Sequence, residues 1–513
     1  MKNWQKYSQI LLSLILLVGL LAPTVLPGNS AEAMVHPLLV KIANDSPDQK
    51  VSVIVQVQSH HLNLEERITE LSGVVTQELP IINAFAAHLS AQAALDLAND
   101  PSVRWVSLDA PVEGSKKRTI GESEQDPPPP VNYFLDTLDV RPVWEMDLKG
   151  QGITVAVIDS GTNQEKDLQV DPTIAKPDSR VLEQLTFNSN AGHVNDATGH
   201  GTHVAGIIGG SGYRSGGLYA GIAPEVNFVS LKISDDTGMA YESDAIGAMQ
   251  WVLDHKDQYN IRAVNMSVNS TQESSYHTSP LDAAAEILWF NGIVVVASVG
   301  NAGPAGGYNT ANAAPANDPF IITVGATNEH GSADISNDTL ASFSAHGTTV
   351  DGFNKPELVA PGTDIISILG PGIWISEHPD HVVMDGEYFR LSGTSMSAPM
   401  VTGAVVLLLQ DEPDLTPDQV KYRLINSGKF IGGGDPYLDI YAAVTGTSVE
   451  SSNTGLVASS LLWTGDDPVS WDSVAWNSVA WNSVAWNSVD WNSVAWNSVA
   501  WNSVAWNSVF WDD

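Results

Sequence analysis

The stretch ITVAVIDSG at residues 153–161 is an apolar run that ends in an acid, a hydroxyl and a glycine. Short apolar runs rich in β-branched residues and bounded by turn residues are typical of strands buried on both faces of a parallel sheet. Such runs alternate with helical patterns along the chain: strands at 154–158, 226–232, 263–267 and 293–298, and helices at 204–208, 242–253 and 280–291. This alternation predicts an α/β fold, a doubly wound and mostly parallel sheet with helices on both faces.

Three polar residues stand where such a sheet places a site. Asp159 follows the first strand, and His200 and Ser395 each precede an apolar helix. Right-handed crossovers bring these positions to one edge of the sheet. A serine hydroxyl is a weak nucleophile at neutral pH, so it needs an imidazole to accept its proton and a carboxylate to orient that imidazole. The three residues therefore supply the parts of an activated serine nucleophile.

Each of these segments, taken alone, also has a structural explanation. An acid after a strand usually caps the strand end, and Gly393-Thr394-Ser395-Met396 alone would be a helix N-cap. A fourth segment, VVVASVGN at 294–301, ends in Asn301 and adds an amide at the same predicted edge. Four segments in one consistent order favour an enzyme over four coincidences.

The four segments resemble the signature blocks of the subtilisin-like serine proteases, the peptidase S8 family, and their order Asp, His, Ser is that family's order. The blocks AGIAP at 220–224 and KPELVAPG at 355–362 extend the likeness over most of residues 131–445. The resemblance implies a catalytic triad and an oxyanion-hole amide; these roles fall on Asp159, His200, Ser395 and Asn301.

The resemblance also implies a groove in which substrate binds as an added β-strand. Its first pocket would have one wall from Ser267, Val268 and Asn269, and the other from Ser298, Val299 and Gly300. Glycine is usual in the family where Asn269 stands, so the width of this pocket stays open. Because no charged residue occurs at these positions, we expect apolar or aromatic residues before the scissile bond.

The composition bounds the setting of this 513-residue chain. Its formal net charge of −36 argues against nucleic acid as a partner, because phosphate binding needs clustered Lys and Arg. There is no cysteine, so neither disulfides nor a cysteine–zinc site stabilise the fold. Lys2 and Lys6, an apolar run and Ala31-Glu32-Ala33 predict a signal peptide over residues 1–33, and hence a secreted protein.

Between the predicted signal peptide and the sheet, residues 50–112 show a strand, helix, strand, helix, strand pattern. In the subtilisin-like family such an α+β unit is a pro-domain that assists folding and inhibits the site until it is cut, and residues 34–118 resemble it. Residues 119–130, rich in proline, predict a linker. The basic triplet at 116–118 is either a cleavage site for another protease or a solvated linker, and the sequence leaves both open.

A metal is implied only by the resemblance. The family commonly binds a structural calcium ion, and Asp167 stands where a ligand often falls, although the Gly- and Ser-rich loop at 211–217 lacks the expected asparagine. A solvated loop aspartate is an equally good interpretation. No H-E-x-x-H motif occurs, and we expect no cofactor for catalysis.

The C-terminal part of the chain has a different character. Residues 446–468 predict a linker, and residues 469–513 repeat the unit Trp-Asn-Ser-Val-Ala with Trp at every fifth position from 471 to 511. Such short repeats favour a stacked array, and a low-complexity tail is the alternative. Exposed aromatic ladders suit cell-surface binding or self-association.

The sequence therefore predicts a secreted serine endopeptidase, made as a self-processing zymogen, that acts on proteins and peptides and is inhibited by its own pro-domain. The alternative is a surface-binding or assembly protein whose protease domain serves mainly its own maturation. The serine-carboxyl peptidases are a third candidate, but they use Glu where this chain has His200.

Overall fold

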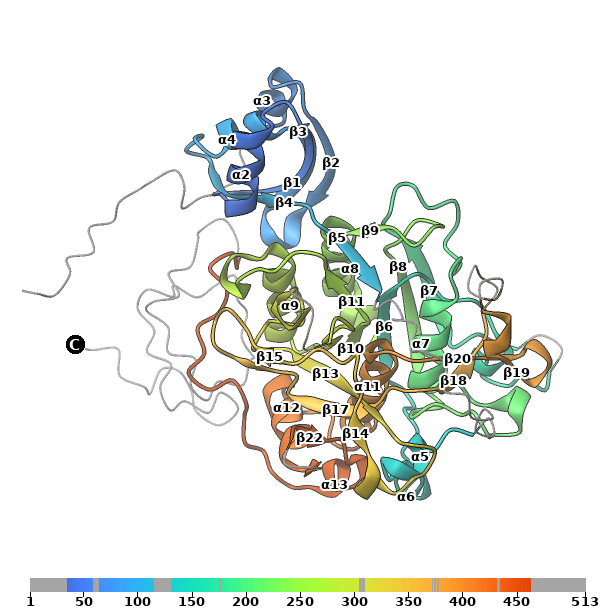
Figure 1. Ribbon diagram of the computed structural model, residues 1–513. Helices are drawn as coiled ribbons and strands as arrows, with labels where there is room; N and C mark the ends of the chain where they lie inside the picture. The colour runs from blue at the N-terminus through green and yellow to red at the C-terminus, as the bar shows by residue number, and fades with distance from the viewer. Residues whose placement is uncertain are drawn as a thin grey trace, which may run out of the picture.

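The computed structural model describes residues 35–58, 64–114, 131–174, 177–303, 310–370, 372, 375, 378–430 and 434–462. They form a small N-terminal unit, residues 35–114, and a larger body, residues 131–462 (Figure 1). Among the described residues, no helix is both long and apolar enough to cross a membrane. The predicted signal peptide, the linker at 119–130 and the repeat tail lie outside the described residues.

The body is built on a ten-stranded sheet with the order β21-β22-β17-β13-β12-β10-β6-β8-β7, to which β14 adds beside β13. All pairs from β7 to β22 along this order are parallel, whereas β14 and β21 pair antiparallel. The strands are β6 (Thr154–Asp159), β7 (Val181–Thr186), β8 (Asn227–Lys232), β10 (Ile261–Met266), β12 (Val294–Ser298), β13 (Ile322–Asn328), β14 (Thr339–Leu340), β17 (Leu358–Pro361), β21 (Lys429–Phe430) and β22 (Pro436–Tyr437). The predicted mostly parallel sheet is confirmed.

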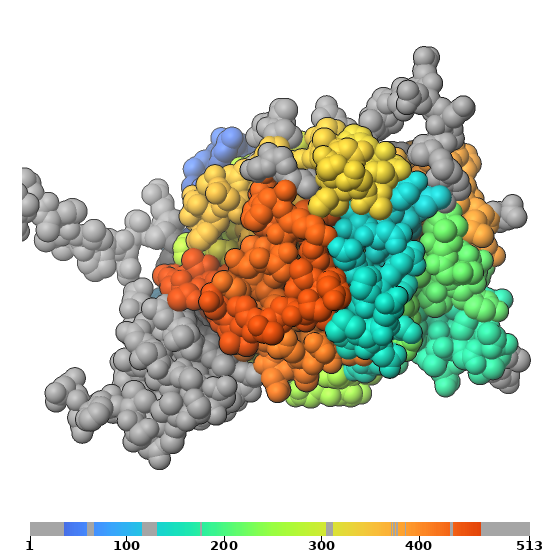
Figure 2. Space-filling model, turned by 90° about the horizontal axis from the view of Figure 1, so that it is seen from below, coloured from blue at the N-terminus to red at the C-terminus, as the bar shows by residue number. Residues whose placement is uncertain are grey.

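Two pairs of helices cover the sheet. In one pair, α7 (His200–Gly209) packs on α11 (Thr394–Asp411), and in the other α8 (Glu242–Tyr259) packs on α9 (Pro280–Phe290). Figure 2 shows the face turned away from the N-terminal unit, where α5 and α6 (cyan) lie beside the C-terminal helices (orange). The remaining helices of the body are α5 (Phe134–Thr137), α6 (Val140–Glu145), α12 (Pro417–Asn426) and α13 (Ile440–Thr445).

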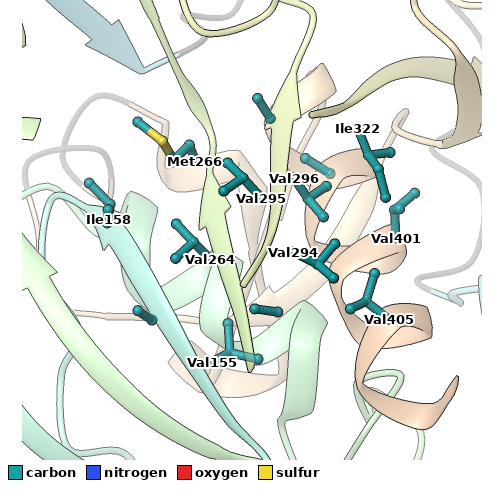
Figure 3. Close-up of a cluster of buried hydrophobic side chains, with 14 of the residues drawn as sticks. Val155, Ile158, Val264, Met266, Val294, Val295, Val296, Ile322, Val401 and Val405 are labelled. Atoms are coloured by element: carbon teal, nitrogen blue, oxygen red, sulfur yellow. The ribbon is translucent and has the colours of Figure 1, made fainter. Parts of the chain in front are cut away.

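The core lies between the sheet and these helices. Figure 3 shows side chains from β6, β10, β12 and β13 meeting those of α11. Val155, Val264, Val295 and Val401 are all fully buried there. Aliphatic side chains on both sides of a parallel strand explain why these strands read as continuous apolar runs rather than as alternating patterns.

The N-terminal unit is a four-stranded antiparallel sheet with the order β2-β3-β1-β4, covered by short helices. Its helix α2 lies ahead of the predicted elements, and two strands occupy the place of the predicted middle strand. The elements are α2 (Pro37–Asp45), β1 (Lys50–Val57), α3 (Leu64–Glu70), β2 (Val74–Leu79), the short 3₁₀ helix η2 (Pro80–Ile82), β3 (Ala84–Ser90), α4 (Ala91–Leu97) and β4 (Val103–Leu108). This confirms a small α+β unit ahead of the α/β body.

The last strand of the N-terminal unit, β5 (Pro111–Gly114), leaves that unit and enters the body (Figure 1). It pairs antiparallel with β11 (Val268–Ser270) on one side and with β9 (Ala240–Tyr241) on the other. Elsewhere in the body, β18 (Ile365–Ile368), β19 (Val382–Val383) and β20 (Tyr388–Leu391) form a small sheet of their own. Two short strands, β15 (Gly347–Thr348) and β16 (Asn354–Lys355), form a separate hairpin pair.

Candidate active site

Asp159 and His200 are in direct contact. Asp159 ends β6 and His200 begins α7, and both are buried; His200 Nδ1 lies 2.7 Å from Asp159 Oδ1. Because a carboxylate can only accept, Nδ1 carries the proton, and Nε2 of the neutral ring is then the basic nitrogen. The strand end and the helix start approach so closely that a Cβ on Gly201 would lie 2.1 Å from the carbonyl oxygen of Gly161. Only glycine fits at position 201.

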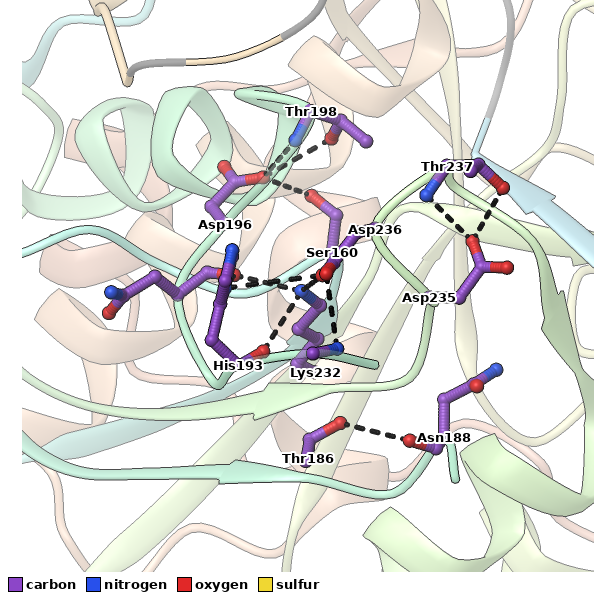
Figure 4. A network of polar contacts seen from close by, with 12 residues as sticks. Ser160, Thr186, Asn188, His193, Asp196, Thr198, Lys232, Asp235, Asp236 and Thr237 are labelled. Atoms are coloured by element: carbon purple, nitrogen blue, oxygen red, sulfur yellow. Dashed lines mark hydrogen bonds and ion pairs between the residues drawn. The ribbon is translucent and has the colours of Figure 1, made fainter. Parts of the chain in front are cut away.

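A second buried acid, Asp196, organises the loop that delivers His200 (Figure 4). Its carboxylate accepts hydrogen bonds from the Ser160 hydroxyl at 2.9 Å, and also from Thr198, Gly199 and Thr202. The Ser160 hydroxyl accepts in turn from the Gly201 backbone at 3.0 Å. Asp196 therefore connects both sides of the Asp159–His200 contact. In the sequence, the one indication of such a role was the position of Asp196 four residues before His200.

Lys232 anchors the start of the same loop. It ends β8, is fully buried, and its Nζ donates to the carbonyls of His193 and Asn195 and to the carboxylate of Asp236 (Figure 4). A buried ammonium needs such partners because desolvation of an unpaired charge is costly. The loop ahead of His200 is thus held from both ends.

The charge around His200 favours its protonated form. Burial lowers its pKa, but the carboxylates of Asp159 and Asp196 raise it more, so that it lies above the ordinary value for histidine. His203, three residues further along α7, is different: burial lowers its pKa to about 3, and its Nε2 donates to the Phe389 carbonyl at 2.9 Å. Of these two histidines, only His200 is placed to exchange protons.

Ser395 lies in the first turn of α11, which packs on the helix that carries His200. Its Oγ is 3.2 Å from the carbonyl oxygen of Ser267, and the Ser267 hydroxyl donates to the Ser395 carbonyl at 3.1 Å. That carbonyl is available because the residue four positions on is Pro399, which has no N–H to donate within the helix. The two serines thus fix the start of α11 against the end of β10.

Asn301 follows β12 and reaches the same helix start. Its Oδ1 accepts from the Thr394 backbone N–H at 2.9 Å and from the Thr394 hydroxyl at 3.0 Å. Because the Thr394 N–H can only donate, the amide oxygen must face Thr394, and the NH₂ group is the end turned elsewhere. The predicted residues Ser395 and Asn301 therefore meet through Thr394.

Strand β5 occupies a groove that ends at His200. Val268 is the backbone partner of Gly114, and Asn269 that of Glu113. A Cβ added to Gly114 would lie 3.7 Å from Cε1 of His200. The hollow at this point is lined by residues of both parts of the chain, among them Val112, Gly114, Asp159, His200, Ala240 and Val268. An extended segment in this groove reaches the His200 imidazole directly.

The two predicted walls of the first pocket are joined by a side chain. Asn269 is buried, and its Nδ2 donates to the Ser298 carbonyl at 2.9 Å, so β11 is bonded to the end of β12. Val299 is also buried, and the Gly300 N–H donates to the Thr394 hydroxyl at 3.1 Å. Of the predicted wall residues, Ser267 is bonded to Ser395 and Gly300 to the neighbouring Thr394, and the Asn269 side chain joins the two walls.

Asp167 does not fit a calcium site. Its two carboxylate oxygens accept from the Arg214 N–H at 3.0 Å and from the Tyr388 hydroxyl at 2.6 Å. The Arg180 guanidinium lies at its carbonyl oxygen, 2.6 Å away. Calcium needs six to eight oxygen ligands, and here donors surround the oxygens that the family would offer.

Within the described ranges, only His378, Asp380 and His381 bring three side chains of metal-ligating type together; one ligand atom from each lies within 4.8 Å of the others. They occupy the segment between β18 and β20, at and beside the short 3₁₀ helix η8 (Pro379–His381). The sequence did not predict this group, because its three residues do not match a metal-binding motif such as H-E-x-x-H.

Comparison with known proteins agrees with this geometry. The profile of the Subtilase family matches residues 150–454, the part that holds Asp159, His200, Asn301 and Ser395. The chain belongs to the subtilase family of serine endopeptidases. Subtilisin E of Bacillus subtilis (strain 168) is 31% identical over 371 residues, which are 72% of this chain and 82% of that protein.

Serine protease AprX of the same organism is 35% identical over 301 residues, 58% of this chain and 65% of its own length. Among solved structures, fervidolysin from Fervidobacterium pennivorans, described as a keratinolytic enzyme related to subtilisin, superposes with a TM-score of 0.59. That alignment covers 79% of this chain and 62% of fervidolysin at 22% identity, so it supports the fold alone.

Proposed function

We propose that this subtilase is a secreted serine endopeptidase made as a zymogen, with residues 34–118 as the pro-domain and residues 131–445 as the catalytic domain. Ser395 is the nucleophile, His200 the general base and acid, and Asp159 the residue that orients His200. The Asn301 amide and the Ser395 N–H form the oxyanion hole. The contact between Asp159 and His200, 2.7 Å long and buried, is the observation that carries this assignment.

The reaction follows from these positions. Ser395 Oγ attacks the scissile carbonyl carbon while its proton passes to His200 Nε2, and the oxyanion accepts hydrogen bonds from Asn301 Nδ2 and the Ser395 N–H. The C–N bond then breaks as His200 protonates the leaving amine. Water attacks the acyl-enzyme with His200 again as base, which releases the acid and restores the serine hydroxyl. Asp159 takes up no proton in these steps and stabilises the imidazolium.

The position of β5 supports zymogen processing and indicates which peptide bond is cut. Substrate-like binding adds an extended strand to an exposed sheet edge, and β5 does this between β11 and β9. Since Gly114 already faces the His200 ring, the bond attacked lies within the next two positions. We therefore assign the maturation cut to Gly114–Ser115 or Ser115–Lys116, ahead of the whole basic triplet.

The link between Asn269 and Ser298 bears on specificity. A side chain that spans the two walls of the first pocket narrows it, so we now favour small residues before the scissile bond over the large apolar ones expected from the sequence. The sequence of the assigned cut, with Gly114 and Ser115, agrees with a narrow pocket. The physical reason is steric, because a filled pocket rejects large side chains.

The assignment of the nucleophile is tested by covalent labelling. A fluorophosphonate probe, which reacts with activated serines, is added to the processed enzyme, and the modified residue is located by peptide mass spectrometry. We expect a single modification on Ser395, lost in Ser395→Ala and strongly reduced in His200→Ala. Modification of another serine, or equal modification in His200→Ala, would contradict the triad. The surface-binding role of the repeat tail stays a separate prediction, because the tail lies outside the described residues.

A further inference from the structure

The segment predicted as a linker after the catalytic domain is partly buried. Residues 456–462, called the clasp here, follow α13 and run up beside α9 to the N-terminal unit (Figure 1). Ala458, Ser459, Leu461 and Leu462 are each 3% exposed or less. Such burial is unusual for a linker, whose backbone polar groups normally face water.

The first half of the clasp is fixed to the body. The Tyr276 hydroxyl donates to the Val457 carbonyl at 2.6 Å, and the Ser460 N–H donates to the His277 carbonyl at 3.0 Å. The Ser459 N–H donates to the buried carboxylate of Glu286, 2.8 Å from Oε2. These bonds involve only residues of the body, so this half of the clasp does not depend on the N-terminal unit.

The second half is fixed to the N-terminal unit. Gln56 Nε2, from β1, donates to the Leu461 carbonyl at 2.6 Å, and Arg104 Nη1, from β4, donates to the Leu462 carbonyl at 3.1 Å. Arg104 Nη2 also donates to the Ser460 carbonyl. Both side chains donate to backbone carbonyl oxygens of the clasp. The contact is therefore directional and needs no negatively charged side chain as a partner.

Apolar side chains seal the same junction. Leu461 and Leu462 belong to one buried cluster with residues of α9, with Ile54 and Trp105 of the N-terminal sheet and with Ile82 of η2. Removal of the N-terminal unit would expose these leucines together with their sheet partners. The clasp thus adds apolar contact to the polar grip of Gln56 and Arg104.

We propose that the clasp retains the N-terminal unit on the enzyme after the chain is cut between them, and so sets how long the enzyme stays inhibited. This rests on the proposed zymogen function for its biological meaning, but the retention itself is a property of the folded chain. The partner surface is the Gln56–Arg104 face of residues 35–114, and its ligand is the backbone of residues 460–462.

The experiment separates retention from self-processing. In the full chain carrying Ser395→Ala, a recognition site for an added, sequence-specific protease replaces part of residues 119–130. After that protease cuts, release of the N-terminal unit is followed by size-exclusion chromatography over time. This background measures retention whether or not the wild-type enzyme processes itself, so a failure of the zymogen proposal and a failure of the clasp give different results.

The variants act on one side of the clasp at a time. Arg104→Met keeps the apolar stem and removes the two donors to the clasp, and we expect release roughly tenfold faster, because hydrogen bonds from a charged donor are stronger than neutral ones. Arg67→Met is the matched control, because Arg67 is half exposed and pairs with Glu70 of the same helix, α3. Release of Arg104→Met at the rate of Arg67→Met would overturn the proposal.

Truncations give a second, independent comparison. A chain ending at residue 468 keeps the clasp and should retain the N-terminal unit as the full chain does, whereas a chain ending at residue 455 should release it faster. If the shorter chain fails to fold, the Arg104→Met result still decides the matter. Equal retention by two folded truncations would contradict the proposal.

A different observation carries a second inference, a transition-metal site at His378, Asp380 and His381. His381 Nδ1 donates to the Arg390 carbonyl at 2.8 Å, which leaves Nε2 as the coordinating nitrogen of the neutral ring. That Nε2 is 3.7 Å from Asp380 Oδ2, and the His378 ring stacks on the His381 ring at 5.3 Å between centroids. Two imidazoles and one carboxylate form a donor set suited to zinc.

We propose that these three side chains bind one Zn²⁺ or a similar divalent ion, with small rotamer changes that close the ligands around it. The site would tie this segment to β20, whose Phe389 carbonyl holds His203 and whose end lies three residues before Thr394. The ion therefore has a stabilising role next to the active site rather than a catalytic one.

Zinc chloride titrated into untagged Ser395→Ala protein, followed by calorimetry, tests the site. We expect one site with micromolar affinity, at least tenfold weaker in His378→Gln and in His381→Gln. The control His330→Asn changes an exposed histidine bonded to Thr339, and it should bind zinc like the parent. No binding by the parent, or binding by the two histidine variants as tight as that of the parent, would overturn the assignment.

Discussion

The catalytic centre and the surface that receives the N-terminal unit both bury carboxylates, but they surround them differently. Asp196, in the centre, accepts hydrogen bonds from Ser160, Thr198, Gly199 and Thr202. Where the N-terminal unit meets this surface, Asp109 of the unit lies near Glu242 and Asp244 of α8. Asp109 accepts hydrogen bonds from Ser243, and Glu242 accepts one from Ser270.

Burial raises the pKa of the acids at both places. In the centre it raises the pKa of Asp196, although four residues donate to this carboxylate. Where the N-terminal unit meets the body, burial raises the pKa of Asp109 to about 6, that of Glu242 to about 8 and that of Asp244 to about 7, and the charge of Asp109 contributes to the shifts of the other two. The difference is that Asp109 belongs to the N-terminal unit, whereas Glu242 and Asp244 belong to the body. Ionisation of these three acids therefore opposes retention of the unit.

The largest expected effect is in the oxyanion hole. Asn301→Ala removes the amide that faces the developing oxyanion, and we expect kcat to fall roughly 10²–10³-fold, a magnitude measured on a subtilisin rather than obtained from this structure. The KM for a peptide substrate should change little, because the amide acts mainly in the transition state. A rise in KM with an unchanged kcat would contradict the assigned role.

The next largest effect concerns the close packing of residues in the centre, compared with the packing at the receiving surface. Gly201→Ala places a Cβ 2.1 Å from the Gly161 carbonyl oxygen, so the Asp159–His200 contact must shift, and we expect kcat/KM to fall about 10²-fold. Gly247→Ala, in α8, places its Cβ 2.2 Å from Nε2 at the flexible end of Gln77 of the N-terminal unit, and at an ordinary contact distance of 3.4 Å from Phe187 of the body.

That second variant is the matched control. Gly247→Ala should leave kcat/KM of the processed enzyme unchanged and weaken only the retention of the N-terminal unit, because Gln77 loses its bond to the Ser243 carbonyl. Equal losses of activity in the two variants would show that the centre is no more rigid than the surface.

The pH dependence of retention sharpens the comparison further. Asp109 has its ordinary pKa near 4 when the unit is free and about 6 when bound, so the bound state holds the extra proton between these values. Affinity is therefore full below about pH 4 and falls by up to roughly tenfold per pH unit up to about pH 6. Glu242 and Asp244 extend the fall towards pH 8.

Release rates of the cut Ser395→Ala protein, measured from pH 4 to pH 8, check this expectation. Asp109→Asn removes one titrating group at nearly constant shape and should flatten the lower part of the profile. Retention that strengthens with rising pH would have the wrong sign for this junction.

The smallest effect concerns the charge behind His200. Activity requires neutral His200, so kcat/KM should rise with pH through a pKa above the ordinary histidine value. Asp196→Asn removes one of the two carboxylates that raise this pKa, and the rising limb of the pH profile should move to lower pH. A variant with lower activity and an unmoved limb would mean that Asp196 acts only through the loop.

The sequence predicted a mostly parallel sheet, four of its strands and the residues proposed for the centre, because each depends on a local pattern: an apolar strand followed by Asp159 or Asn301, and a helix preceded by His200 or Ser395. It did not predict strands β7, β13 and β17 or the order of strands in the sheet. The predicted α+β unit was also found, although α2 and one extra strand were missed. These elements are too short to show a clear hydrophobic periodicity in the sequence.

What the sequence did not predict depends on distant contacts. Gln56 and Leu461 are 405 positions apart, and no pattern near either residue announces their bond. The link from Asn269 to Ser298 and the donors around Asp196 likewise arise only when separate strand ends converge. The calcium expectation at Asp167 failed to fit for the same reason, since Arg180 and Tyr388 reach it from other parts of the chain.

The central claim is that Ser395 cuts its own chain at the end of β5. N-terminal sequencing and intact mass of the wild-type protein and of Ser395→Ala, secreted from the same host, test it most directly. We expect a new N-terminus at Ser115 or Lys116 in the wild type, and an uncut precursor in Ser395→Ala. The same cut in both proteins, or a wild-type N-terminus only beyond Arg118, would contradict the account.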